Sequence, residues 1–145
     1  MSLARPITGP EMPVDVSIII INWNSVGFLG KCLTSVFANT TGINYEVIVV
    51  DNASYDGCAE LIASEFPTVR FVQSEHNLGF AGGNNFAVKV ACGRILLFLN
   101  SDTEVIGSAL QQMLAWTFQR ASRTPFVPIP TRSSIMSRAL CSSRR

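Results

Sequence analysis

The stretch Ile95-Leu-Leu-Phe-Leu-Asn100-Ser-Asp102-Thr-Glu104 decides the fold of this chain. Five apolar residues run directly into a polar Asn-Ser-Asp step. An uninterrupted apolar run of this length predicts a strand that is buried on both faces, as in a parallel sheet. Open α/β sheets bind ligands at the carboxyl ends of their strands, so the carboxylate of Asp102 lies where a ligand site is expected.

Two earlier segments repeat this arrangement. One apolar run ends in asparagines, in Val16-Ser-Ile-Ile-Ile-Ile-Asn22-Trp-Asn24, and another ends in an acid and an amide, in Glu46-Val-Ile-Val-Val-Asp51-Asn52. Since the carboxyl ends of parallel strands meet at one edge of the sheet, the three segments together predict a single polar crevice.

Between these predicted strands, apolar residues recur at the spacing of an α-helix. It predicts a helix over 26–39, with Ser25 as its N-cap. The remaining predictions are strands over 16–23, 45–51, 69–73 and 94–99, a short helix that stops at Pro67, and helices over 84–92 and 106–119. This alternation predicts an α/β fold, a Rossmann-like and mostly parallel sheet with flanking helices, in the strand order 3-2-1-4.

Composition divides the chain into three segments. Residues 1–14 form a lead-in, residues 15–119 carry the strand and helix pattern, and residues 120–145 are rich in Arg, Ser and Pro. All ten acidic residues precede residue 105, whereas six of the eleven basic residues follow it. We expect the last segment to be disordered or non-native. Its arginines are dispersed rather than clustered, so no nucleic-acid partner is predicted.

Cysteine usage and hydropathy exclude other classes of protein. Cys32, Cys58 and Cys92 are predicted to be small buried residues, because no C-x-x-C pair or His-containing spacing indicates a zinc site. No apolar segment approaches the roughly 20 residues that span a bilayer, and Met1–Pro13 lacks a signal-peptide pattern. We therefore expect no membrane span and a cytoplasmic location, either free or peripheral at the inner face of the membrane.

The two acidic strand ends each have two interpretations. Asp102 either helps to hold a divalent cation on substrate phosphates or caps the following helix. Asp51 either accepts hydrogen bonds from a ribose or a base, or closes a turn with Asn52 and Ser54. The residues alone leave both alternatives open.

The loop Asn77-Leu-Gly79-Phe-Ala-Gly82-Gly83 precedes the third predicted helix. Its glycines either present backbone N–H groups to a phosphate or permit a tight turn. It is not G-x-G-x-x-G and follows the third strand, so a dinucleotide-binding fingerprint is a poor match. Trp23 and Phe80 flank the crevice and are predicted to be packing residues, and His76 is predicted to be an exposed loop residue.

Taken in order, four motifs over residues 15–116 resemble the inverting family 2 glycosyltransferases with the GT-A fold. The pattern is similar to the rhamnosyltransferase-like branch in particular. The matching segments are Val16-Ser-Ile-Ile-Ile-Ile-Asn22-Trp-Asn24, Val49-Val-Asp51-Asn52-Ala-Ser54-Tyr-Asp56-Gly57, Asn77-Leu-Gly79-Phe-Ala-Gly82-Gly83-Asn84-Asn85 and Leu97-Phe-Leu-Asn100-Ser-Asp102-Thr.

The resemblance implies a role for each matching position. Asp51 would contact the nucleotide base, with Asn22 and Asn24 as the adjacent wall. Asn100 would lie near the ribose in place of the family's first acid, which removes one charge. Asp102 would bind Mg²⁺ or Mn²⁺ on the donor diphosphate. The other positions expected to bind the nucleotide sugar are Asn52, Ser54, Asn77, Gly79 and Gly83.

The resemblance also implies an activity, the metal-dependent, inverting transfer of a sugar from a UDP- or dTDP-sugar donor to a glycan or lipid-linked acceptor. Family members place the general base in a second half, and no Asp or Glu follows Glu104 here. We therefore expect a truncated donor-binding half without its catalytic base. A nucleotide-binding remnant without turnover is the alternative. A phosphatase with a nucleophilic aspartate is disfavoured, because Asn100 stands at the nucleophile position.

Overall fold

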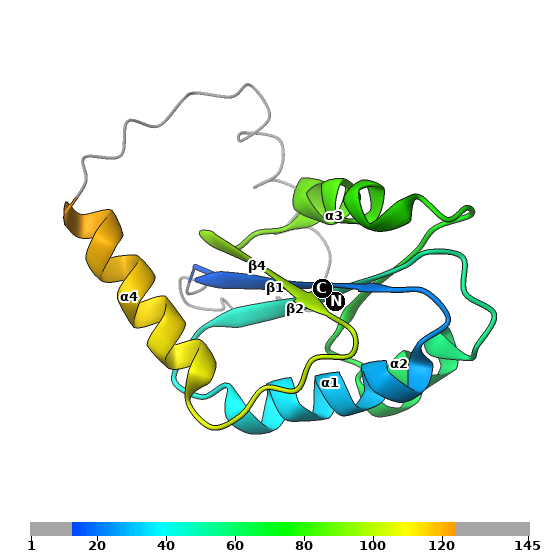
Figure 1. The fold of residues 1–145 in the computed structure, drawn as a ribbon, viewed down its shortest axis with the longest axis horizontal. Helices are drawn as coiled ribbons and strands as arrows, with labels where there is room; N and C mark the ends of the chain where they lie inside the picture. The colour runs from blue at the N-terminus through cyan, green and yellow to red at the C-terminus, as the bar shows by residue number, and fades with distance from the viewer. Residues whose placement is uncertain (1–12, 124–145) are drawn as a thin grey trace, which may run out of the picture.

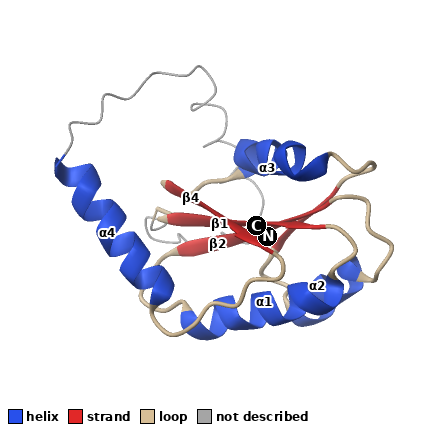
Figure 2. Ribbon diagram, in the orientation of Figure 1, coloured by secondary structure: helices blue, strands red, loops and turns tan. Residues whose placement is uncertain are grey.

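A computed structural model describes residues 13–123 of the chain, with strands and helices in strict alternation (Figures 1 and 2). The elements are β1 (Val16–Asn22), α1 (Val26–Asn39), β2 (Tyr45–Asp51), α2 (Cys58–Glu65), β3 (Arg70–Gln73), α3 (Gly79–Val90), β4 (Ile95–Asn100) and α4 (Ala109–Arg123). The predictions for most of the lead-in and for residues 124–145 fall outside the described residues.

All strands of the described sheet are parallel, in the order β3-β2-β1-β4. This confirms the predicted fold class and strand order. The register places Asn22 beside Asp51, and Ile21 beside Asn100. The polar strand ends therefore meet at one edge of the sheet, as the sequence predicts.

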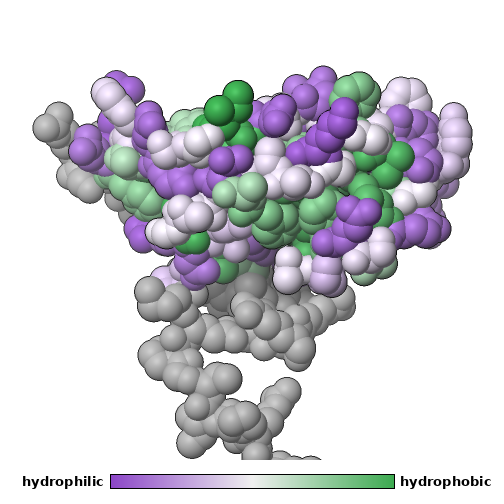
Figure 3. Space-filling model, turned by 90° about the horizontal axis from the view of Figure 1, so that it is seen from below, coloured by the Kyte–Doolittle hydropathy of each residue, from purple (hydrophilic) through white to green (hydrophobic). Residues whose placement is uncertain are grey.

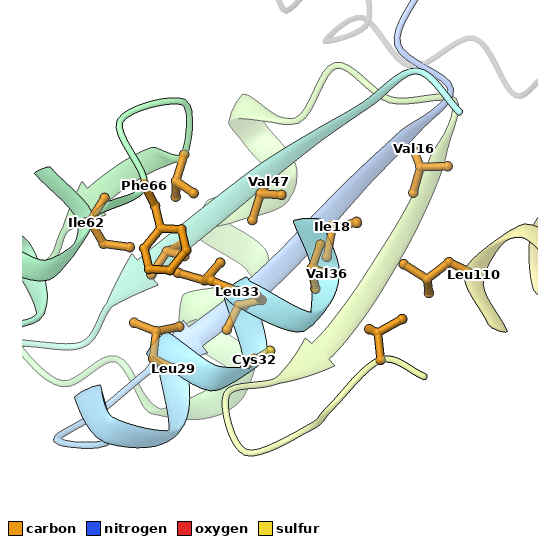
Figure 4. Close-up of a cluster of buried hydrophobic side chains, with 14 of the residues drawn as sticks. Val16, Ile18, Leu29, Cys32, Leu33, Val36, Val47, Ile62, Phe66 and Leu110 are labelled. Carbon is orange, nitrogen blue, oxygen red and sulfur yellow. The ribbon is translucent and has the colours of Figure 1, made fainter. Parts of the chain in front are cut away.

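Helices cover both faces of the sheet. Helices α1 and α2 lie on one face and α3 on the other, while α4 slants past the amino ends of the strands (Figure 1). The larger core lies under α1, where Leu33 and Val36 pack on Ile18 and Val47 (Figure 4). Viewed from the α1 and α2 side, the outer surface mixes apolar and polar residues (Figure 3).

Strand β4 is not buried on both faces, contrary to the prediction. Ile95, Leu97 and Leu99 face the larger core. The alternate residues Leu96 and Phe98 are 37% and 46% exposed. The reason is position: β4 is an edge strand of the described sheet, and α3 packs over β1 and β2 instead. An apolar run therefore predicts a strand, but it does not show whether a helix covers both faces of that strand.

Helix α3 begins at Gly79, five residues earlier than predicted. The glycines read as a loop instead form its first turns. Gly83 is buried against the sheet, and a Cβ atom there would lie 3.1 Å from Ile21 Cδ1. Glycine at this position thus favours the close approach of α3 to β1. Helix α4 begins three residues later than predicted and continues to Arg123.

Candidate functional site

A pocket of about 660 Å³ opens at the carboxyl ends of β1 and β4, beside the start of α3. Five of the predicted site residues line it together: Asn52, Asn77, Gly79, Asn100 and Asp102. The pocket also contains six residues that were not predicted to bind ligand: Ile21, Trp23, Ser25, Phe28, Phe80 and Ser101. Another hollow, of about 610 Å³, is lined mainly by residues of α1, together with Leu61 and Glu65 of α2 and with Glu104.

Asp51 lies behind this pocket and does not line it. The residue is 1% exposed. Its Oδ1 accepts a hydrogen bond from Asn22 Nδ2 at 2.9 Å, and its Oδ2 accepts from Ser54 N at 2.9 Å and Gln73 Nε2 at 2.6 Å. Burial raises the pKa of this carboxyl, but the hydrogen bonds from Ser54, Asn22 and Gln73 outweigh it and hold the pKa below its usual value. Asp51 is an ionised anchor for three strand ends.

The other predicted wall residues belong to the same support. The hydroxyl of Ser54 accepts hydrogen bonds from Asn22 Nδ2 at 3.2 Å and from Asn24 N at 2.9 Å. Asn24 Oδ1 accepts from Tyr55 N at 3.0 Å, and Asn24 has a φ of 48°. Asn22, Asn24 and Ser54 therefore hold the two strand ends together, beneath the pocket rather than in its lining.

Asp51→Asn should lower the free energy of unfolding at pH 7 by about 1–3 kcal/mol, because three donors, among them the buried Asn22 amide, lose an ionised acceptor. The folded pKa is depressed, so the contribution of Asp51 is complete above the unfolded pKa of about 3.9 and is lost as pH falls through the folded pKa. Urea unfolding measured from pH 7 to pH 3 should show a shallower acid decline in Asp51→Asn than in wild type. Exposed Glu65→Gln is the control, and an acid decline in Asp51→Asn equal to that of wild type would contradict this role.

Asn52 is the neighbour that faces the pocket. Its Nδ2 donates to Gly79 O at 3.2 Å, which joins the end of β2 to the start of α3. Its Oδ1 is buried and has no hydrogen-bond partner among the described residues. Buried polar atoms are nearly always paired, so this carbonyl oxygen is an unpaired acceptor buried behind the surface of the pocket.

Asp102 occupies the turn that follows β4. Thr103 N donates to Asn100 O at 3.1 Å, which closes the turn. The Asp102 side chain is exposed at the pocket, and no group in the described part of the chain hydrogen-bonds to it. Helix α4 begins only at Ala109, so Asp102 is not its N-cap. This removes the structural alternative that the sequence left open.

The residues around Asp102 could hold a cation only together with the phosphates of a bound ligand. Within residues 13–123, no group of three or more His, Cys, Asp or Glu side chains is placed to hold a metal ion. Mg²⁺ typically binds one or two carboxylates together with substrate phosphates and waters. A single unengaged carboxylate in a pocket with room for a diphosphate satisfies that pattern.

Three exposed aromatic side chains surround the pocket. Trp23, Phe28 and Phe80 are 60%, 60% and 61% exposed. The prediction that Trp23 and Phe80 are packing residues is therefore wrong. Exposed aromatic rings around a pocket are typical of ligand stacking. The signal in the sequence was the placement of Trp23 directly after the first strand.

The remaining candidates are structural. Gly83 packs on the sheet and lies outside the pocket lining. Cys32 and Cys58 are buried free thiols, as predicted. Cys92 is half-buried and disulfide-bonded, so the prediction that it is a small buried residue outside any disulfide is wrong. Burial and then the Asp102 carboxylate raise the pKa of Cys32 to about 11, and burial and then Asp51 raise that of Cys58 to about 12. Both thiols stay protonated at neutral pH and are unsuited to act as nucleophiles.

The family model described as glycosyl transferase family 2 matches residues 17–122. The chain belongs to glycosyl transferase family 2. Its relatives include the succinoglycan biosynthesis protein ExoO of Rhizobium meliloti, 32% identical over 101 residues that cover 69% of this chain and 29% of ExoO. A second is the UDP-Glc:alpha-D-GlcNAc-diphosphoundecaprenol beta-1,3-glucosyltransferase WfgD of Escherichia coli, 30% identical over 101 residues that cover 69% of this chain and 40% of WfgD. The chain thus spans less than half the length of either relative.

Solved structures agree with this assignment. The S. aureus TarS 1-349 complex with UDP-GlcNAc matches with a TM-score of 0.64 and 25% identity, over 74% of this chain and 32% of that one. The mannosyltransferase PcManGT of Pyrobaculum calidifontis, in complex with GDP-Man and Mn²⁺, shares the fold with a TM-score of 0.65 at 22% identity, over 81% of this chain and 34% of that one. The family 2 domain is thus a GT-A-type sheet. In its described part, no helix is both long and apolar enough to cross a membrane.

Proposed function

We propose that this family 2 domain binds a UDP- or dTDP-sugar together with Mg²⁺ or Mn²⁺ in the pocket between β1, β4 and α3. The observation that carries the proposal is the unengaged Asp102 carboxylate in the same pocket as the unpaired Asn52 acceptor and the exposed Trp23 ring. These three groups match the three parts of such a donor that differ most in chemistry: the charged diphosphate, the polar edge of the base and its flat face.

Base recognition falls to Asn52 and Trp23 in this proposal. Uracil and thymine share a ring N–H, which Asn52 Oδ1 could accept if the side chain turned from its buried position toward the pocket, and their faces can stack on the indole of Trp23. Asp51, which the family resemblance assigned to the base, has both oxygens engaged by other residues and lies outside the pocket lining. Asn100 lines the same pocket and is assigned to the ribose.

Asp102 would hold the cation with the donor diphosphate. When bound, the cation stabilises the negative charge that develops on the departing nucleoside diphosphate. Inversion would follow from a single displacement of that diphosphate by an acceptor hydroxyl. We assign the acceptor to a glycan or lipid-linked sugar, as in the rhamnosyltransferase-like branch that the motifs resemble.

A second candidate function is nucleotide-sugar binding without turnover by this chain. It is favoured by one observation: no Asp or Glu follows Glu104, so a general base beyond the metal site is absent from this sequence. Transfer of labelled sugar to any acceptor by the 145-residue chain would exclude it.

The nucleotide site is tested by titrating UDP, dTDP and GDP into the protein with and without Mg²⁺, by calorimetry. Trp23→Ala should weaken binding of UDP or dTDP by about 1–3 kcal/mol, the usual contribution of a stacked base. Trp116→Ala is the matched control, since Trp116 is 71% exposed on α4 and outside the pocket. Equal losses in the two variants, or no binding of any nucleotide by the folded wild type, would overturn the proposed site.

A further inference from the structure

Ser25 occupies the N-cap position of α1 but does not cap the helix. Its φ of −132° and ψ of 33° come with no side-chain cap hydrogen bond, so the predicted capping role is wrong. The hydroxyl instead donates to Asn22 Oδ1 at 2.7 Å and lies 2.9 Å from Ser101 Oγ. A residue type favoured for capping is thus directed into the pocket.

The side chain that caps α1 is that of Asp56. Val26 N, at the start of α1, donates to Asp56 Oδ2 at 2.8 Å, and Cys58 N, at the start of α2, donates to Asp56 Oδ1 at 3.2 Å. One carboxylate therefore serves two helix starts, where negative charge is also favoured by the helix dipoles. The Ser25 side chain is not needed for helix formation.

The hydrogen bonds around Ser25 have a defined direction. The ionised Asp51 only accepts, so the Asn22 amide nitrogen must point to Asp51 and its oxygen to Ser25. Ser25 has one proton, which it donates to Asn22, so Ser101 must be the donor in the contact between the two serines. Successive hydrogen bonds are therefore donated from Ser101 to Ser25, from Ser25 to Asn22 and from Asn22 to Asp51. Each bond polarises the next.

We propose that Ser25 is a positioning residue for Asp102, acting through Ser101. The inference rests on the proposed donor site. Ser101 immediately precedes Asp102, so its hydrogen bond to Ser25 ties the turn after β4 to the rigid end of β1. Without that tie, the turn carrying the carboxylate is free to shift away from the place where a cation meets the diphosphate.

The test compares Ser25→Ala with Ser25→Thr and wild type, with the free Mn²⁺ signal in electron paramagnetic resonance as the readout. With UDP or dTDP present, Ser25→Ala should bind Mn²⁺ about 10-fold more weakly, the lower end of the usual loss for groups that orient metal ligands. Ser25→Thr keeps the hydroxyl and should restore most of the affinity. That recovery would assign the effect to the hydroxyl, because a merely structural loss would not be reversed by a bulkier side chain.

Urea unfolding separates positioning from folding. Asp56→Ala should lower the unfolding midpoint, and so should Ser25→Ala, because it leaves Oδ1 of the buried Asn22 without its donor. Ser101→Ala keeps that bond and should stay close to wild type. Ser101→Ala breaks the same contact from the other side and should reproduce the Mn²⁺ defect, which keeps the test available if Ser25→Ala folds poorly. Wild-type Mn²⁺ affinity in Ser25→Ala or Ser101→Ala, or no recovery in Ser25→Thr, would overturn the role of Ser25. Absence of nucleotide-dependent Mn²⁺ binding in wild type would overturn the donor site itself, and this inference with it.

Discussion

Asp102→Asn should abolish the metal dependence of nucleotide binding and weaken UDP or dTDP binding in Mn²⁺ by more than about 100-fold, beyond the usual loss for a group that only orients a ligand. Asp102 is the one carboxylate among the residues that line the described pocket. The amide retains the shape but loses the charge, and an amide is a poor substitute where a cation is otherwise held only by phosphates and waters. Calorimetric titration with and without Mn²⁺ measures the effect.

Glu104→Gln is the matched control for that variant. Glu104 lies two residues further along, is exposed, and stands outside this pocket, so the change removes the same charge from the same loop. Nucleotide affinity in Mn²⁺ should stay close to wild type. If Glu104→Gln and Asp102→Asn lose affinity equally, the effect is one of long-range charge, and Asp102 is not a ligand.

Gly93→Ala should destabilise the fold by about 3 kcal/mol or more, at the upper end for overpacked sites. A Cβ atom at Gly93 would lie 2.3 Å from Ser17 N and 2.6 Å from Val16 C. Both are backbone atoms of β1, so no side-chain rotation can relieve the clash. The connection from α3 to β4 must then move away from the sheet. Urea unfolding monitored by circular dichroism measures the loss.

The close approach at Gly93 is held by hydrogen bonds that the added methyl group would also disturb. Gly93 N donates to Ser17 Oγ at 2.8 Å, and Cys92 N donates to Glu46 Oε1 at 2.6 Å. These bonds seat the start of β4 against β1 and β2. If the connection from α3 to β4 is displaced, these part-buried hydrogen bonds are lost as well, which adds to the cost of the clash.

Gly27→Ala is the control for the glycine variant. Gly27 lies in α1, and a Cβ atom there would meet nothing within 4 Å. Alanine in a helix is favoured over glycine by about 0.5–1 kcal/mol, so this variant should be neutral or more stable than wild type. Equal unfolding midpoints for Gly93→Ala and Gly27→Ala would show that the backbone at Gly93 is not closely packed.

The candidate site divides into what was predictable and what was not. The strand-end motifs placed Asn52, Asn100 and Asp102 together correctly, because parallel strands align their carboxyl ends. They did not reveal that, of these two buried neighbours, Asn52 contributes to the pocket lining and Asp51 does not. Successive side chains at a strand end point in different directions, and which of them faces a pocket depends on neighbours from β1, β3 and α3.

The sequence by itself determined the order of strands and helices, the parallel sheet and the edge at which the polar residues gather. These follow from local apolar periodicity and short connections, which act over a few residues. Only the tertiary structure decided that Leu96 and Phe98 are exposed, that Asp56 caps α1 in place of Ser25, and that Gly83 serves packing. Each of these depends on a partner distant along the chain, or on which face of the sheet a helix covers. The local spacing of apolar residues contains no information about either.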